Sequence, residues 1–131
     1  MITLDTHVIV WNALNSNEMS VRANKEIKRA QTVGEMLIAD ISLWEIAMLI
    51  KKQRLNIETT YTEFIRLIME AFPCRIIPIS PEIADLSVGL SDSINLDPAD
   101  SLICSTSIIE GAPLITADKN LRNSDLVHTI W

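Results

Sequence analysis

The sequence predicts an α/β fold in which short strands alternate with helices and form a mainly parallel sheet. Two observations support this prediction. The apolar, β-rich runs are short, as in MLIA (Met36–Ala39) and PLIT (Pro113–Thr116). The segments between such runs carry apolar residues at helical spacing, for example Leu43, Ile46 and Ile50.

Each element in the N-terminal half has its own signal. Residues 1–4 (MITL) form a short β-rich run, and an apolar helical stretch follows from Val8 to Leu14. A polar, amphipathic helix is expected over residues 20–31, followed by a strand over residues 36–39. The next helix is expected over residues 42–53, with its apolar residues in one stripe.

The C-terminal half has clearer helix boundaries. Ser80 and Pro81 have the residue types preferred at the cap and the first position of a helix, and Pro98 again suits a first position. Gly111 is a natural helix end. The predicted elements are helices over 60–71, 80–90 and 98–110, and strands over 75–79, 113–116 and 127–131.

Composition limits the classes of function. The 131 residues contain no repeat or Gly/Ser-rich linker, so one domain over residues 1–131 is expected. Without a signal peptide or an apolar run of membrane-spanning length, a cytoplasmic protein without a membrane partner is expected. The net charge of −6 argues against a broad basic surface for nucleic acid. An RNA-binding function would therefore need metal ions or a local basic patch.

Four acidic residues occupy equivalent places around the predicted sheet. Asp5 and Asp118 follow strands, whereas Glu45 and Asp100 lie in the first turns of helices. In a parallel sheet these positions gather at one edge, beyond the carboxyl ends of the strands. Crowded carboxylates repel one another, and a hard divalent cation such as Mg²⁺ or Mn²⁺ would relieve that repulsion.

Simpler explanations exist for several residues. SLWE (residues 42–45) fits a capping box, as does TYTE (residues 60–63), so Glu45 could merely satisfy a backbone N–H. Asp97 could cap the helix that Pro98 begins. His7 has no His or Cys partner in sequence, which favours a surface histidine over a metal ligand. The tryptophans Trp11, Trp44 and Trp131 are expected in the core or an interface, since no basic residues are interleaved with them.

The motifs ITLDTHVIVW, ISLWEIAMLIKKQRL, DPADSLI and LITADKNL resemble, in order and spacing, those of PIN-domain ribonucleases. The resemblance is strongest to the VapC-type toxins of toxin–antitoxin pairs and covers essentially the whole chain. It implies a three-layer α/β/α sandwich and a Mg²⁺- or Mn²⁺-dependent endoribonuclease that leaves a 5′-phosphate and a 3′-hydroxyl. The family's acids correspond to Asp5, Glu45, Asp100 and Asp118.

The resemblance also implies roles and partners. Asp5 and Asp100 would hold the principal ion, Asp118 would complete that site or hold a second ion, and Glu45 would bind the second ion or activate water. Thr6 and Thr116 match small hydroxyl positions beside the acids. The expected partners are RNA, a second copy of the chain, and an antitoxin whose C-terminal segment lies in a groove beside the active site.

One departure from the family motif leaves an alternative open. Relatives often carry Arg after the second Asp of DPxD, where this chain has Ser101. The lost positive charge puts substrate affinity in question. A non-catalytic PIN-like module that binds RNA or protein therefore remains the alternative to a ribonuclease.

Overall fold

The computed structural model describes all residues from 1 to 131. Its centre is a five-stranded, entirely parallel sheet in the order β3-β2-β1-β4-β5. The strands are β1 (Ile2–Leu4), β2 (Met36–Ala39), β3 (Cys74–Ile77), β4 (Leu114–Ile115) and β5 (Thr129–Ile130). The predicted parallel α/β fold is confirmed.

Helices connect the strands, and most begin where the sequence predicted. They are α1 (Thr6–Ala13), α2 (Val21–Val33), α3 (Ile41–Lys51), α4 (Tyr61–Ala71), α5 (Pro81–Ile94), α6 (Pro98–Glu110) and α7 (Lys119–Arg122). The side chains of Ser20, Thr60, Ser80 and Asp97 cap α2, α4, α5 and α6. None of these helices is long and apolar enough to cross a membrane.

The structure differs from the prediction at several element boundaries, and it adds one helix. Helix α5 continues to Ile94 rather than ending near residue 90, and it stops at Asn95 in the left-handed region with φ 52°. Strand β3 ends at Ile77, ahead of Pro78, which has no N–H to donate to the sheet. The short helix α7 was not predicted, because four residues are too few to show a helical period.

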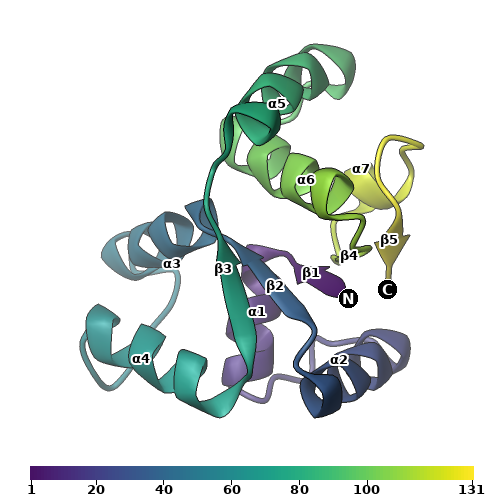
Figure 1. The fold of residues 1–131 in the computed structure, drawn as a ribbon. Helices are drawn as coiled ribbons and strands as arrows, with labels where there is room; N and C mark the ends of the chain where they lie inside the picture. Colours follow the sequence, from purple (N-terminus) through teal and green to yellow (C-terminus); the bar gives the residue numbers. More distant parts are fainter.

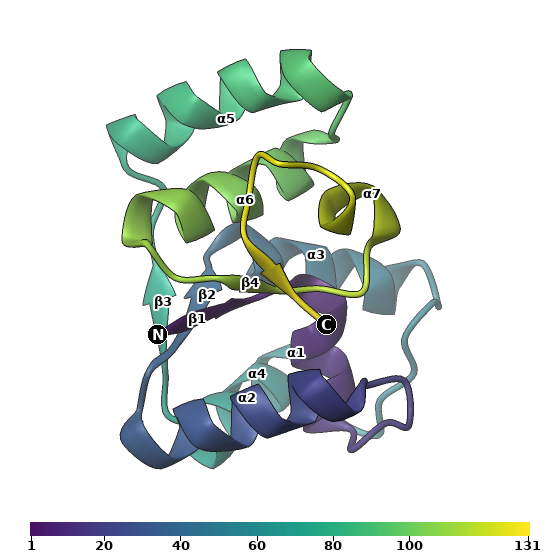
Figure 2. The ribbon, with the colours of Figure 1, turned by 90° about the vertical axis from the view of Figure 1, so that its right-hand side faces the viewer.

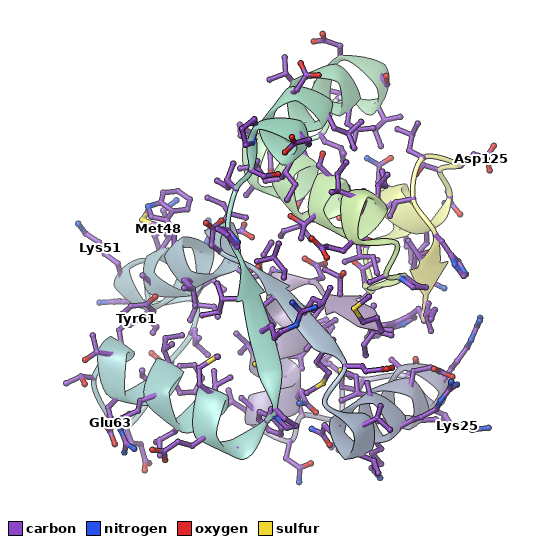
Figure 3. The ribbon with its side chains drawn as sticks, viewed as in Figure 1. Lys25, Met48, Lys51, Tyr61, Glu63 and Asp125 are labelled. Carbon is purple, nitrogen blue, oxygen red and sulfur yellow. The ribbon has the colours of Figure 1, made fainter.

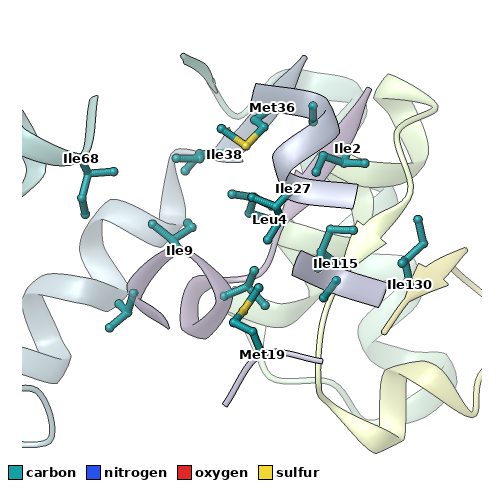
Figure 4. Close-up of a cluster of buried hydrophobic side chains, with 14 of the residues drawn as sticks. Ile2, Leu4, Ile9, Met19, Ile27, Met36, Ile38, Ile68, Ile115 and Ile130 are labelled. Carbon is teal, nitrogen blue, oxygen red and sulfur yellow. The ribbon is translucent and has the colours of Figure 1, made fainter. Parts of the chain in front are cut away.

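Alternating residues along the strands pack on opposite faces of the sheet. Met36 and Ile38 of β2 join the larger cluster, which also contains Leu4 of β1 and Ile115 of β4 (Figure 4). Leu37 points to the opposite face, where it packs in another cluster. This two-sided burial explains why β2 is apolar at every position rather than alternating with polar residues.

Helices cover both faces of the sheet. Helices α1, α2 and α4 lie on one side and α5, α6 and α7 on the other, with α3 near the edge (Figures 1 and 2). Helix α5 lies outside α6 in Figure 2. The arrangement agrees with the three-layer sandwich that the resemblance implied.

The order of the strands changes direction beside β1, and such a place in an open parallel sheet is called a topological switch point. The strands β1, β2 and β3 proceed toward one edge, after which the chain returns through α5 and α6 to place β4 on the other side of β1. In open parallel sheets, binding sites form where the strand order reverses, beyond the carboxyl ends of the strands. Here that place lies between the ends of β1 and β4.

Candidate active site at the carboxylate cleft

A cleft of about 400 Å³ opens at the switch point. Among its lining residues are five acids: Asp5, Glu45, Asp97, Asp100 and Asp118. The other lining residues are His7, Trp11 and Ala117, so no lysine or arginine contributes to the cleft wall. The structure therefore brings together the four predicted acids and Asp97.

Asp5 lies at the centre of this arrangement because it is the single residue between the end of β1 at Leu4 and the start of α1 at Thr6. Its side chain is held at both oxygens. Oδ1 accepts a hydrogen bond from the Thr6 backbone N–H at 2.8 Å, and Oδ2 accepts one from the Thr116 hydroxyl at 2.7 Å. Asp5 is 9% exposed, so these contacts fix a nearly buried carboxylate at the floor of the cleft.

The capping explanation for Glu45 is wrong. Helix α3 begins at Ile41 with Asp40 as its N-cap residue, two residues before Ser42, the N-cap that the capping box requires. The Glu45 carboxylate instead accepts a hydrogen bond from the Thr6 hydroxyl at 2.6 Å, and Thr6 Oγ1 also lies 2.9 Å from Ser42 Oγ. Glu45 is thus tied to the residue after Asp5, 39 positions away in sequence.

The similar motif at Thr60 behaves as an ordinary helix start. Thr60 Oγ1 accepts a hydrogen bond from the Glu63 N–H at 3.3 Å, and the Glu63 side chain pairs with Arg66 on the same helix. Two sequence motifs of one pattern therefore have different structures, and only the one beside β1 contributes to the cleft.

The two aspartates of DPAD have separate roles. Asp97 caps α6, because its Oδ1 accepts a hydrogen bond from the Asp100 backbone N–H at 2.8 Å. The Asp100 side chain lies in the first turn of α6 and receives no hydrogen bond. Its lone pairs are therefore free to bind a ligand in the cleft.

Asp118 and Thr116 complete the β4 side of the cleft. Asp118 Oδ1 caps α7 by accepting hydrogen bonds from the N–H groups of Asn120 and Leu121. The Asp118 backbone N–H donates to Thr116 Oγ1 at 3.1 Å, and that hydroxyl donates to Asp5. This chain of contacts connects the ends of β1 and β4. Asp118 keeps its second carboxylate oxygen free.

Burial and mutual repulsion disturb the ionisation of the acids. Burial raises the pKa of Asp5, against the opposing effect of the Thr116 and Thr6 hydrogen bonds. Burial also raises the pKa of Glu45, with Asp5 and Asp97 adding to it. The pKa of Asp100 rises to about 7, through burial first and then through Asp97 and the other acids. Such crowding is costly unless a cation enters the cleft.

The donor set fits a hydrated divalent cation. No three of the His, Cys, Asp and Glu side chains stand close enough to hold an ion by themselves. Mg²⁺, however, normally keeps several waters and uses only one or two protein carboxylates. The free Asp100 carboxylate beside the fixed Asp5 supplies this kind of hard oxygen ligand.

We expect Mg²⁺ or Mn²⁺ to stabilise the folded protein. An ion that binds only the folded state at about 100 times its Kd adds roughly 2–3 kcal/mol to the free energy of unfolding. Thermal unfolding with MgCl₂, compared with NaCl at equal ionic strength, separates binding from simple screening. A melting temperature that is the same in both salts would contradict a metal site here.

We also expect Asp100→Asn to stabilise the metal-free protein, and more at pH 8 than at pH 5. The folded pKa of about 7 lies above the ordinary value of 3.8, so the folded state binds the Asp100 proton more tightly than the unfolded state. The stability of the wild type consequently falls as pH rises between these values, whereas asparagine does not titrate.

The expected gain at pH 8 is about 1–2 kcal/mol after allowance for solvent screening of this half-buried group. Urea unfolding in EDTA at the two pH values measures it. A gain in unfolding free energy that is larger at pH 5 than at pH 8, or that is absent at both, would contradict a raised pKa of Asp100.

A second hollow adjoins the cleft between α3 and α6. It measures about 690 Å³, and its lining residues are Asp40, Ile41, Trp44, Glu45, Ile79, Asp97, Pro98, Ala99 and Leu102. We call it the α3–α6 groove. Glu45 and Asp97 line both the groove and the carboxylate cleft, so the two hollows share a wall.

Two groove residues compare differently with the prediction. Trp44 was expected in the core or an interface; it is 56% exposed and lines the groove, which leaves the interface as the alternative. Asp40 was not predicted. Asp40 Oδ2 accepts the Ile79 N–H, but its buried Oδ1 has no partner. Asp40 could have been identified from the sequence, because it directly follows the apolar run of β2 just as Asp5 directly follows the apolar run of β1.

The positive charges and Ser101 lie elsewhere. Lys25 on α2 and Lys51 on α3 point outward, away from the sheet (Figure 3). Ser101 is 1% exposed, and its hydroxyl lies 2.7 Å from that of Ser91 on α5. In this chain, the Ser101 hydroxyl makes a contact between α5 and α6, and it is not accessible to a substrate in the cleft.

Comparisons with known proteins identify relatives of this arrangement. A family model described as PIN domain matches residues 2–125. Ribonuclease VapC22 of Mycobacterium tuberculosis is 32% identical over 122 residues, which cover 93% of this chain and 90% of the relative.

Solved structures give the same result for the fold. A toxin–antitoxin complex from Klebsiella pneumoniae aligns with a TM-score of 0.67 and 25% identity, covering 98% of this chain and 97% of the other. VapBC2 from Rickettsia felis, bound to a DNA fragment from its promoter, aligns with a TM-score of 0.74 at 18% identity and the same coverage.

Fold and site together define the class as a parallel α/β domain with a carboxylate cleft at its switch point. Within that class, the chain belongs to the PIN domain family. The predicted family is confirmed, and the VapC-type proteins are among its relatives.

Proposed function

We propose that this chain is a divalent-metal-dependent endoribonuclease that acts as the toxin of a toxin–antitoxin pair. The observation that carries the proposal is the placement of Asp5, Glu45, Asp100 and Asp118 around one cleft at the switch point. The similarity to a named ribonuclease over most of the chain supports cleavage of RNA. A cytoplasmic location, where RNA is plentiful, belongs to the same proposal.

Asp5 and Asp100 are the proposed ligands of the principal ion, Mg²⁺ or Mn²⁺, with Asp118 completing the site directly or through water. A bound ion would supply positive charge against the phosphate oxygens of the RNA and would orient a water molecule for attack. Thr116 fixes the Asp5 carboxylate by its 2.7 Å hydrogen bond, and so acts as a positioning residue.

Glu45 is proposed to bind a second ion or to accept the proton of the attacking water. The Thr6 hydroxyl holds one of its oxygens at 2.6 Å and leaves the other free. Burial raises the pKa of Glu45, which makes it a stronger base than an exposed carboxylate. Asp97 has a supporting role, because it caps α6 and thereby sets the position of Asp100.

The proposed protein partner is a small antitoxin, as in the toxin–antitoxin complex from Klebsiella pneumoniae. The α3–α6 groove is the proposed contact, since it is largely apolar and shares Glu45 and Asp97 with the cleft. A segment in that groove would block the cleft beside it. A homodimer, which the resemblance implied, is tested by light scattering after size-exclusion chromatography.

RNA cleavage with and without metal distinguishes the ribonuclease from the non-catalytic alternative. The wild type should cleave a mixed RNA pool in Mg²⁺ or Mn²⁺, and neither EDTA-treated protein nor Asp5→Asn should do so. RNA binding without cleavage in any divalent metal would favour the binding module.

A further inference from the structure

One wall of the carboxylate cleft has no part in the proposed chemistry. It is formed by His7 and Trp11 of α1, with Trp131 behind them. The rings of His7 and Trp11 have centroids 5.8 Å apart at 49°, and those of Trp11 and Trp131 are 5.9 Å apart at 51°. These spacings are typical of interacting aromatic rings. We call the three residues the aromatic wall.

The aromatic wall has a packed side and an open side. Trp11 and Trp131 are only partly buried where they pack against the larger core cluster. His7 is exposed, and it lies four residues before Trp11 on the same face of α1. The open side of the wall faces the cleft, because His7 and Trp11 both line it.

The charge of the cleft determines which part of an RNA can bind to it. Five acids and no lysine or arginine line the cleft, so phosphates are repelled wherever no metal neutralises the acids. The remaining favourable contacts are to the uncharged bases. Unpaired RNA bases bind proteins mainly by stacking on aromatic side chains. The cleft volume of about 400 Å³ is also in the range of small-ligand sites.

We propose that the aromatic wall is a nucleobase subsite, in which a base next to the scissile phosphate stacks on Trp11 with His7 beside it. The inference rests on the proposed RNA substrate and adds a specific contact to it. It also revises the expectation for Trp11 drawn from sequence. That expectation required basic residues between the aromatics, whereas here the aromatic wall adjoins carboxylates that a metal would neutralise.

The direct test uses nucleosides, which carry a base but no phosphate, on the full-length protein in EDTA. The three tryptophan indole N–H signals are followed by NMR and assigned with Trp→Phe variants. Adenosine, guanosine, cytidine or uridine should shift the Trp11 signal in a saturable way and leave the Trp44 signal in place. Ribose 5-phosphate, which lacks a base, should shift neither.

A kinetic test compares Trp11→Leu with Val88→Ala, a change at an apolar residue that is 68% exposed on α5 and lines neither the cleft nor the groove. Loss of a stacked base should lower kcat/KM for RNA about tenfold in Trp11→Leu, mainly through KM, and should leave Val88→Ala near wild type. Trp11→Phe, which keeps a ring, should recover most of the loss. Melting temperatures show whether Trp11→Leu remains folded, and Trp11→Phe tests the subsite if it does not.

The possible results distinguish a failure of the nucleobase subsite from a failure of the proposed ribonuclease function. No Trp11 shift with any nucleoside, or equal shifts of Trp11 and Trp44, would overturn the subsite even if RNA is cleaved. Ordinary cleavage by a folded Trp11→Leu would do the same. A saturable Trp11 shift in a protein that cleaves no RNA would support the subsite and overturn the ribonuclease.

Discussion

Asp100→Asn should lower the rate of RNA cleavage by on the order of a thousandfold while raising the melting temperature of the metal-free protein. The change is isosteric and leaves the Asp97 cap on the Asp100 backbone N–H in place. It removes the cleft carboxylate whose pKa burial and the neighbouring acids raise to about 7, and which accepts no hydrogen bond. The reduced rate would follow from weaker metal binding, and the stabilisation from weaker repulsion.

Asp97→Asn is the matched control for this prediction. Asparagine caps helices about as well as aspartate, so α6 should begin at the same place. The substitution removes one negative charge from the same cleft, but from a side chain whose Oδ1 is engaged in capping. Cleavage should remain within about tenfold of wild type. Equal losses of RNA cleavage in the two variants would mean that the total negative charge of the cleft, rather than a metal ligand at Asp100, controls the reaction.

The four acids were predictable from sequence because each follows a strand or begins a helix. In a parallel sheet, the positions after the strands meet at one edge. Asp5 and Asp118 are an example, because they follow the neighbouring parallel strands β1 and β4. What the sequence could not provide was the local geometry. The motifs at residues 42–45 and 60–63 have the same pattern, yet only in the second does the first residue cap a helix with its side chain.

The difference between these motifs arises from long-range contacts. Helix α3 starts at Ile41, directly after β2, and Ser42 and Glu45 meet Thr6 from another part of the chain. Helix propensity and capping rules describe only neighbours within a few residues. For the same reason the sequence did not separate Trp11 from Trp44. Their different positions depend on which helix faces the cleft and which faces the groove.

The last prediction concerns the antitoxin and the α3–α6 groove. Trp44→Ala should lower antitoxin affinity by about 30-fold or more, because a partly exposed aromatic side chain in a groove commonly dominates an interface. RNA cleavage by this variant should stay near wild type, since Trp44 is not part of the carboxylate cleft. Val21→Ala, which trims an apolar residue that is 88% exposed on α2, is the control for a general loss of exposed apolar surface.

Antitoxin affinity should also weaken as Mg²⁺ rises. The groove and cleft share Glu45 and Asp97, so a basic antitoxin side chain that reaches this wall would pair with Asp5, Asp100 or Asp118 and compete with the ion. Because salt alone weakens exposed ion pairs, the titration is compared with NaCl at equal ionic strength. An affinity that depends only on ionic strength would exclude competition at the acids. Unchanged binding by a folded Trp44→Ala would exclude the aromatic anchor independently, because that side chain contributes no charge.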